Sequence, residues 1–330
     1  AIDFCDFYAR EMERLGKPQR LGRVPGELDV MFYRPRGVAA VIAPWNFPLA
    51  ILCGMVMAAA VTGNTVVMKP AEQSSVIAAK FMEIVLEAGF PAGVINFLPG
   101  FGEQVGAHLV ESPKTNLIAF TGSMDVGLKI LQVAGHTNPL QREVKKVVCE
   151  MGGKNAVIVD ADADLDEAIH GVMHSAFGFQ GQKCSACSRV IVHESCYEEF
   201  KNRLVAATKS MQIGPAWDPG TAVGPVVDGG SRRKIQEYVE LGKQEGTLLV
   251  QRDVPAGGFY VGPAIFEGIT PEHRLAQEEI FGPVVALMRA TDFDHAIALA
   301  NSTRFALTGA VYSRSPYNIQ QAYEEFDVGN

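Results

Sequence analysis

A short apolar run, Val38-Ala39-Ala40-Val41-Ile42-Ala43, predicts a buried β-strand in the first part of the chain. Residues 48–61 follow with a helical pattern, and a second apolar run over residues 64–68 predicts the next strand. Strands that lack a polar face and alternate with helices are typical of a parallel sheet covered on both sides. This stretch therefore predicts a doubly wound α/β fold.

The alternation of strands and helices continues in both directions from this stretch. Residues 4–15 predict a helix, and residues 19–34 predict a hairpin or flap. Further strands are predicted over 94–98, 117–120, 147–149, 156–159, 189–192 and 308–312, with irregular strands before residue 266. Further helices are predicted over 74–88, 102–110, 123–134, 164–176, 196–210, 231–245 and 292–301. Residues 324–330 read as the beginning of a strand, and Gly152-Gly153 reads as a domain boundary.

Composition excludes several classes of protein. The chain has 330 residues, of which 48% are hydrophobic and 20% charged, so it can bury a large core and is not a disordered protein. Its net charge of −8, with no basic tract, argues against nucleic-acid binding. The longest apolar stretch, residues 47–61, contains Pro48 and Gly54 and predicts a buried helix rather than a transmembrane segment. Six cysteines in a chain of this length predict no disulfide framework and favour a reducing compartment such as the cytoplasm.

Cys184 is the candidate nucleophile. A buried cysteine is often only a small apolar residue, but Gly181, Gln182 and Lys183 before it make a poor core strand. A thiolate attacks electrophilic carbon, and a base can then activate the water that hydrolyses the resulting thioester. Glu150 is the candidate base, and it lies in a second glycine turn, Glu150-Met151-Gly152-Gly153-Lys154.

Cys184 also begins the sequence Cys184-Ser185-Ala186-Cys187, which has the spacing of a redox pair or of half a zinc site. The chain has no second pair of this kind, and His170 and His174 lack a further ligand. A metal site is therefore not predicted.

Other motifs admit both a structural and a functional interpretation. Asn46, between Pro44 and Pro48, is either a turn residue or an oxyanion donor. The segment Phe120-Thr121-Gly122-Ser123 joins a strand to a helix and could hold a phosphate on backbone N–H groups. Lys69-Pro70-Ala71-Glu72 and Glu278-Glu279-Ile280-Phe281-Gly282-Pro283 are either exposed loops or contacts to a nucleotide ribose.

These motifs together carry a resemblance that none of them carries alone. In chain order they are Pro44-Trp45-Asn46-Phe47-Pro48, Lys69-Pro70-Ala71-Glu72, Phe120-Thr121-Gly122-Ser123, Glu150-Met151-Gly152-Gly153-Lys154, Gly181-Gln182-Lys183-Cys184 and Glu279-Ile280-Phe281-Gly282-Pro283. The series resembles the NAD(P)-dependent aldehyde dehydrogenase superfamily over nearly the whole chain. The run from Phe177 to Ala186, with residues 277–283 and 307–313, resembles its glutamate 5-semialdehyde (1-pyrroline-5-carboxylate) dehydrogenase branch, whose members also occur within bifunctional proline-utilisation enzymes.

The resemblance implies a Rossmann-type doubly wound cofactor domain over residues 1–152 and an α/β catalytic domain over 153–330. Residues 17–35 resemble an oligomerisation flap, so a homo-oligomer is expected. The family continues past Asn330 into a loop that anchors the substrate, and relatives carry a longer N-terminal segment. We therefore expect the chain to be a fragment, which in its parent is either alone or fused to a proline dehydrogenase domain.

The resemblance also implies a role for individual residues. Cys184 would attack the aldehyde carbon, Asn46 would bind the oxyanion, and Glu150 would activate the hydrolytic water. NAD is the expected cofactor, because a carboxylate at Glu72 would bond ribose hydroxyls and repel a 2′-phosphate. The expected cofactor contacts are Trp45, Lys69, Glu72, Gly122, Ser123, Glu279 and Phe281, and the expected substrate contacts are Phe177, Lys183 and Ser185.

Three alternatives remain open from the sequence. The substrate could be another small aldehyde, such as succinate semialdehyde. The chain could be a non-catalytic protein with the same fold, although Cys184, Glu150 and Asn46 occur together. Cys184 and Cys187 could instead serve thiol–disulfide exchange.

Overall fold

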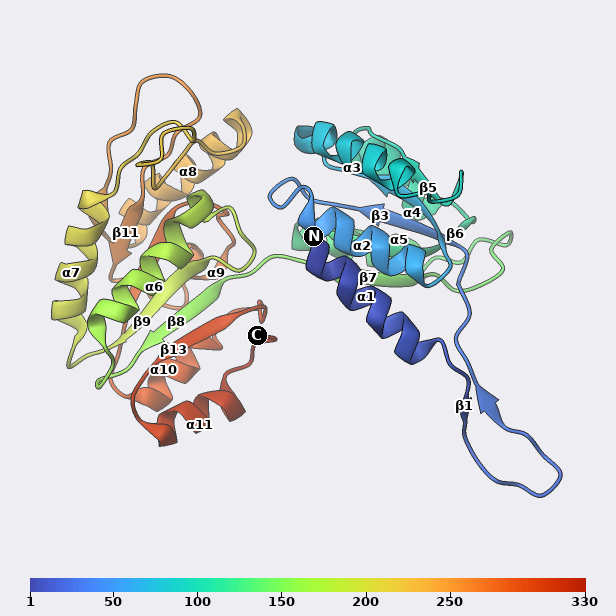
Figure 1. Ribbon diagram of the computed structural model, residues 1–330. Coiled ribbons are helices and arrows are strands. Elements are labelled where there is room, and N and C mark those ends of the chain that lie inside the picture. Colours follow the sequence, from blue (N-terminus) through green and yellow to red (C-terminus); the bar gives the residue numbers. More distant parts are fainter. The chain divides into compact units, whose positions relative to one another are not determined.

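The computed structural model describes residues 1–330, which divide into two compact units, Ala1–Met151 and Gly152–Asn330 (Figure 1). Each unit has its own sheet and its own hydrophobic core. No helix in either unit combines the length and the apolar character needed to cross a membrane.

The first unit contains a five-stranded parallel sheet with the strand order β5-β4-β3-β6-β7. Its strands are β3 (Val38–Ile42), β4 (Thr65–Lys69), β5 (Ile95–Phe97), β6 (Thr115–Thr121) and β7 (Lys146–Glu150). The chain adds strands in one direction from β3 to β5 and then returns to place β6 beside β3. The order therefore reverses between β3 and β6, as in doubly wound α/β folds. This confirms the Rossmann-type fold predicted from the sequence.

Helices cover both faces of this sheet because successive strand residues point to opposite sides. Val41 and Met68 pack with one pair of helices, α2 (Ala50–Val61) and α3 (Ser75–Glu87). Ile42 and Phe120 pack on the other face, with α4 (Ala107–Glu111) and α5 (Met124–Ala134). Two short helical turns, Glu72–Ser74 and Gly102–Gly106, precede α3 and α4.

Two peripheral elements of the first unit precede the sheet. The helix α1 (Ile2–Leu15) packs on α2 and has no fully buried side chain. The predicted flap is a small antiparallel hairpin of β1 (Gln19–Arg20) and β2 (Val30–Met31). Its apolar side chains are largely exposed, among them Leu21 at 67% and Leu28 at 75%.

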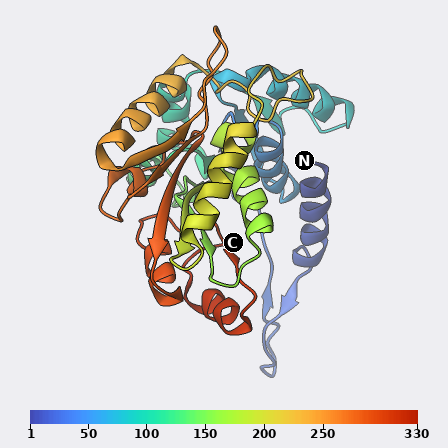
Figure 2. The same ribbon diagram turned by 90° about the vertical axis from the view of Figure 1, so that its left-hand side faces the viewer.

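The second unit contains a six-stranded sheet with the order β10-β11-β12-β9-β8-β13. Only β10 runs antiparallel to its neighbour. Its strands are β8 (Asn155–Val159), β9 (Cys187–His193), β10 (Thr247–Gln251), β11 (Ala264–Glu267), β12 (Val284–Ala290) and β13 (Gly309–Tyr312). The helices α6 (Leu165–Phe177) and α7 (Tyr197–Ser210) pack on one face (Figure 2). The opposite face packs on α8 (Gly229–Glu245) and α10 (Phe293–Ala300).

The structure adds three elements of the second unit that the sequence patterns did not predict. The strand β12 pairs in parallel with both β9 and β11, although its first five residues, Val284–Met288, are an apolar run that shows no period of two. The helices α9 (Arg274–Gln277) and α11 (Pro316–Glu325) were also missed. For α11 a signal was present, because Ser315 caps its first turn and Pro316 follows at the first helical position.

The expectation of a strand at the end of the chain is wrong. Residues 324–325 complete α11, and residues 326–330 have no strand geometry. The carbonyl of Asn330 nevertheless accepts a hydrogen bond of 2.9 Å from the backbone N–H of Gly309.

Candidate active site

Three of the six motifs meet at one edge of the second unit's sheet. The Gly152-Gly153-Lys154 turn leads into β8, the Cys184 turn leads into β9, and the Glu279–Pro283 turn leads into β12. These strands are adjacent, in the order β12-β9-β8, and they run parallel. Their amino ends therefore lie together, which brings a thiol, a carboxylate and a glycine turn into one region although they are far apart in the sequence.

Asn155 fixes the backbone around Cys184. Its Nδ2 donates hydrogen bonds of 2.6 Å to the Cys184 carbonyl and 2.9 Å to the Ala186 carbonyl, and its Oδ1 accepts one from the backbone N–H of Thr308. A Cβ atom on Gly153 would lie 2.4 Å from the Cys184 carbonyl oxygen, so only glycine permits this approach. No sequence pattern pointed to Asn155, which lies at the start of an apolar strand.

The backbone before Cys184 adopts an unusual left-handed conformation. Phe179, Gln180 and Gly181 have φ values of 54°, 58° and 65° in succession. Non-glycine residues with positive φ are strained, and such residues gather at functional sites. The buried side chain of Gln182 supports the turn, since its Oε1 accepts a hydrogen bond of 2.9 Å from the backbone N–H of Val227. Cys184 itself is half-buried at the end of this turn.

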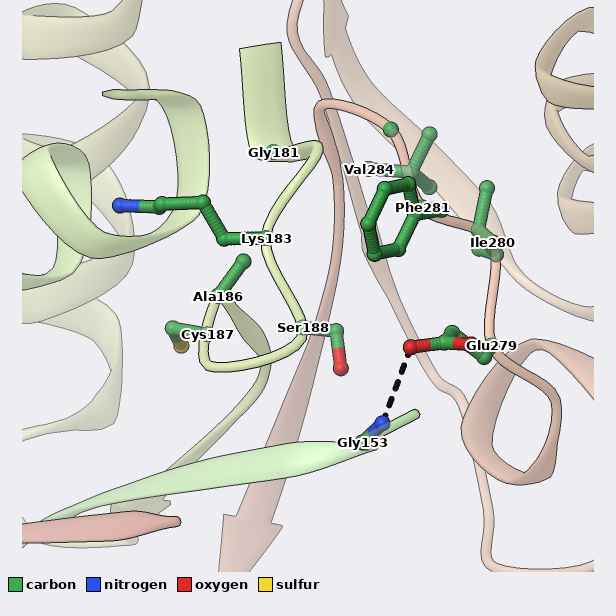
Figure 3. Close-up of a pocket in the computed structure, with 11 residues that line it drawn as sticks. Gly153, Gly181, Lys183, Ala186, Cys187, Ser188, Glu279, Ile280, Phe281 and Val284 are labelled. Carbon is green, nitrogen blue, oxygen red and sulfur yellow. Dashed lines mark hydrogen bonds between the residues drawn. The ribbon is translucent and has the colours of Figure 1, made fainter. Parts of the chain in front are cut away.

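Glu279 and Gly153 of the glycine turn both line a small cavity of about 20 Å³ (Figure 3). The Oε1 atom of Glu279 accepts a hydrogen bond of 2.9 Å from the backbone N–H of Gly153. Burial raises the pKa of Glu279, although this hydrogen bond and the charges of Lys234 and Lys154 oppose the rise. Ser188 lines the same cavity, and its buried hydroxyl has no hydrogen-bond partner. The cavity is large enough for about one water molecule.

Phe281, which also lines the cavity, is the third non-glycine residue with a positive φ, at 59°. A left-handed conformation at a bulky side chain persists only where the surrounding structure imposes it. The two segments with left-handed backbone, residues 179–181 and Phe281, thus belong to two loops that line the same cavity (Figure 3).

Arg189 is the structural anchor behind this edge. Its guanidinium is 1% exposed and donates to three carbonyls: Nε to Lys154 at 2.9 Å, Nη1 to Leu299 at 2.7 Å and Nη2 to Ala300 at 2.7 Å. Two of these carbonyls belong to the last turn of α10, whose negative dipole end favours a cation. Burial lowers the pKa of Arg189 only to about 10, so the side chain stays charged at neutral pH.

Lys154 should make the stability of the protein depend on pH. Its Nζ is buried without a hydrogen-bond partner, and burial above all lowers its pKa to about 7 from the ordinary 10.5. Below about pH 7 the lysine is protonated in both the folded and the unfolded chain. Between pH 7 and 10.5 only the unfolded chain binds this proton, so the free energy of unfolding should rise with pH, by at most about 5 kcal/mol.

Denaturant unfolding of wild type and Lys154→Met at about pH 7 and about pH 9.5 tests this prediction, because methionine fills similar space without titrating. The wild-type protein should gain stability relative to the variant as the pH rises. Equal pH slopes for the two proteins would contradict the assignment.

In the first unit, four motifs lie at the carboxyl ends of strands, not at the amino ends. The Pro44–Pro48 turn follows β3, Lys69–Glu72 follows β4, Phe120–Ser123 completes β6, and Glu150 is the last residue of β7. All four strands run parallel, so these residues share the carboxyl edge of the sheet, beside the point where the strand order reverses. Ligands of open α/β sheets bind at this edge.

Lys69 and Glu72 form a preorganised pair at the carboxyl edge. Lys69 is 3% exposed, and its Nζ lies 3.2 Å from Glu72 Oε1, which also accepts a hydrogen bond of 2.5 Å from the backbone N–H of Gly102. Burial alone would raise the pKa of Glu72. Hydrogen bonds from its own backbone N–H, from Lys69 and from Gly102 outweigh burial and hold the pKa below its ordinary value. The carboxylate is therefore ionised and suited to accept hydrogen bonds from hydroxyl groups.

Ser123 is the N-cap of α5, where its hydroxyl accepts a hydrogen bond from the backbone N–H of Val126. A Cβ on Gly122 would lie 2.5 Å from the Phe120 ring, which explains glycine at this position. Asn46 is 4% exposed, Trp45 is half-buried and Glu150 is exposed at the end of β7. The structure thus brings the predicted residues of this unit to one edge.

The three predicted substrate residues differ in how far they are buried. Phe177 is fully buried in the core among α6 and β9, so this placement does not support a direct substrate contact. Lys183 is half-buried, which lowers its pKa, and Ser185 is exposed. Cys187 is 3% exposed, and burial raises the pKa of its thiol to about 12, which makes it a poor partner for thiol–disulfide exchange. The residues show no group of three metal-binding side chains.

Comparison with known proteins connects these sites to a family. The model of the aldehyde dehydrogenase family matches residues 1–330. The chain is 50% identical, over its whole length, to a curated protein of Geobacillus thermodenitrificans named 1-pyrroline-5-carboxylate dehydrogenase, and it spans 64% of that protein.

Solved structures agree with this match. The crystal structure of proline utilization A (PutA) from Bdellovibrio bacteriovorus, inactivated by N-propargylglycine, matches with a TM-score of 0.98 and 57% identity. The match covers 100% of this chain and 34% of that one. A 1-pyrroline-5-carboxylate dehydrogenase from Thermus with bound NAD matches with a TM-score of 0.97 and 47% identity, again over the whole of this chain and 64% of that one.

Proposed function

We propose, since the chain belongs to the aldehyde dehydrogenase family, that it carries the NAD-binding and catalytic parts of an enzyme that oxidises L-glutamate 5-semialdehyde to L-glutamate. The observation that carries the proposal is the convergence at the amino edge of the second unit. There a half-buried thiol follows a strained turn, and Asn155 fixes its carbonyl. The relatives named above support the choice of substrate.

In the proposed reaction, the sulfur of Cys184 forms a bond to the aldehyde carbon. The carbonyl oxygen gains negative charge, for which the Asn46 amide and the Cys184 backbone N–H are the proposed donors. Loss of a hydride from the same carbon leaves a thioester on Cys184. Glu150 then removes a proton from the water that cleaves the thioester and releases the carboxylic acid.

NAD is the proposed cofactor and, when bound, accepts the hydride. The first unit offers suitable groups, because the ionised Glu72 can accept hydrogen bonds from ribose hydroxyls and would repel the 2′-phosphate of NADP. Ser123 and Gly122, at the amino end of α5, suit a pyrophosphate. Glu279 is the proposed contact to the second ribose, and Trp45 and Phe281 are proposed as apolar contacts. Lys69 supports Glu72 through their ion pair.

The assembly of the protein is a second part of the proposal. The β1–β2 hairpin exposes Leu21, Leu28 and Phe32, which are 67%, 75% and 51% accessible, and such a surface suits contact with another copy of the chain. We propose a homo-oligomer that uses this hairpin, in a protein either separate from or joined to a proline dehydrogenase domain. Size-exclusion chromatography with light scattering tests the assembly, and a monomer would contradict it.

The decisive experiment is NADH formation by the full-length protein with three substrates: L-glutamate 5-semialdehyde, succinate semialdehyde and a simple alkyl aldehyde. Preference for the first, measured as kcat/KM, supports the proposal. Turnover of the other aldehydes alone would keep the family and reject the substrate. Absence of turnover with all three would favour a non-catalytic protein of the same fold.

A further inference from the structure

Two cysteines outside the proposed site lie in direct contact. Cys5 on α1 and Cys53 on α2 are 48 residues apart in the sequence, and their sulfur atoms are 3.6 Å apart. The two helices lie side by side in the first unit (Figure 1). Neither cysteine is in a disulfide. A disulfide bond is about 2.05 Å long, so the sulfur atoms would need to approach by only about 1.5 Å.

The two thiols have different environments. Cys5 is exposed, whereas Cys53 is 2% exposed and faces Cys5. Burial, with a smaller effect from the hydrogen bond to Cys5, raises the pKa of the Cys53 thiol to about 12. Cys53 alone is therefore protected from oxidants, since the thiolate is the reactive form. An oxidant from solvent would reach Cys5 first, with Cys53 placed to react with the product.

The surrounding packing makes this contact important for α1. The helix α1 packs on α2 through side chains that are only partly buried, and none of them is fully buried. Gly54, next to Cys53, lets α1 approach closely, because a Cβ there would lie 3.2 Å from the ring of Phe4. A covalent bond at Cys5 and Cys53 would therefore attach a helix without a buried side chain to one that lies within the core of the unit.

We propose that Cys5 and Cys53 form a reversible modification site, at which a peroxide converts the two thiols into a disulfide that joins α1 to α2. Cys5 sulfur attacks one peroxide oxygen and becomes a sulfenic acid, with release of one water. Cys53 sulfur then attacks Cys5 sulfur while its proton passes to the departing oxygen: the S–S bond forms, the S–O bond breaks, and a second water leaves. The two thiols lose two electrons, the peroxide is reduced, and a dithiol reductant reverses the reaction. The site is independent of the proposed dehydrogenase activity.

The test uses the full-length protein with Cys184→Ala, so that oxidation of the proposed nucleophile does not interfere. After treatment with hydrogen peroxide, remaining thiols are alkylated and the protein is digested for mass spectrometry. We expect the peptides that contain Cys5 and Cys53 to be joined with loss of two hydrogens, and to separate on treatment with dithiothreitol. Hydrogen exchange in α1 should slow on oxidation and recover on reduction.

Cys5→Ser is the matched control, because this exposed position tolerates a hydroxyl, and it should abolish both the cross-link and the change in exchange. Cys53→Ser should also abolish the cross-link. Oxidation of Cys5 to sulfinic acid without a cross-link would overturn the proposal. So would a disulfide between two molecules, seen as a dimer on a non-reducing gel.

Discussion

Replacing Cys184 with alanine is expected to lower kcat for NAD-dependent aldehyde oxidation by about 10⁴-fold or more. The variant has no sulfur to bond to the aldehyde carbon, so neither the thiohemiacetal nor the thioester can form. The measurement is the rate of NADH formation with saturating L-glutamate 5-semialdehyde. Binding of NAD, followed by calorimetry, should remain close to wild type, because the proposed adenosine contacts lie in the first unit, at Lys69 and Glu72.

Cys187→Ala is the matched control for this prediction. Cys187 is another cysteine of the same segment, but it is buried with a thiol pKa raised to about 12. Removing its sulfur should leave kcat within about tenfold of wild type, since the loss is a small cavity at the start of β9. Equal loss of activity in both variants would instead favour a function in which the two cysteines act as a redox pair.

Replacing Gly181 with alanine is expected to destabilise the protein by about 3 kcal/mol or more and to lower kcat by about 10²-fold. Gly181 has a φ of +65°, and a Cβ there would lie 2.4 Å from the Gly282 carbonyl oxygen and 2.9 Å from that of Ala176. Both neighbours are backbone atoms, so neither can move without shifting a loop of the site. The displacement would reach Cys184, three residues later.

Gly268→Ala separates conformational strain from crowding. Gly268 has a similar φ of +74°, but nothing lies within 4 Å of the position that its Cβ would take. It should therefore cost only about 1 kcal/mol, from the left-handed conformation alone, and leave kcat unchanged. Denaturant unfolding and steady-state kinetics of both variants measure the difference. A similar loss of stability in the two variants would mean that the contact with Gly282 has no energetic importance.

Much of the fold could be predicted from local patterns. The alternation of buried strands and helices over residues 38–134 predicted the doubly wound sheet, because each strand of a parallel sheet is apolar throughout and each connection needs a helix. The prediction failed at β12, where an apolar run of five residues has no period of two, and at α9, which is only four residues long. A local pattern cannot distinguish a central strand from another buried segment at that length.

The sequence by itself determined the chemical groups of the site and the ends of the strands on which they occur. Cys184, Glu279, Lys69 and Glu72 are identifiable because glycine and proline turns mark where strands begin or end, and these signals are local. Family membership also follows from the order of the motifs.

Only the tertiary structure decided which of these groups meet. The strand order β12-β9-β8 places the Cys184 and Glu279 turns beside Gly153, and pairing between distant strands cannot be read from any local period. Tertiary packing also buried Phe177, left Lys154 without a hydrogen-bond partner and brought Cys5 against Cys53. Burial and contact depend on segments far apart in the sequence, and these determine the pKa of a side chain and the groups with which it can react.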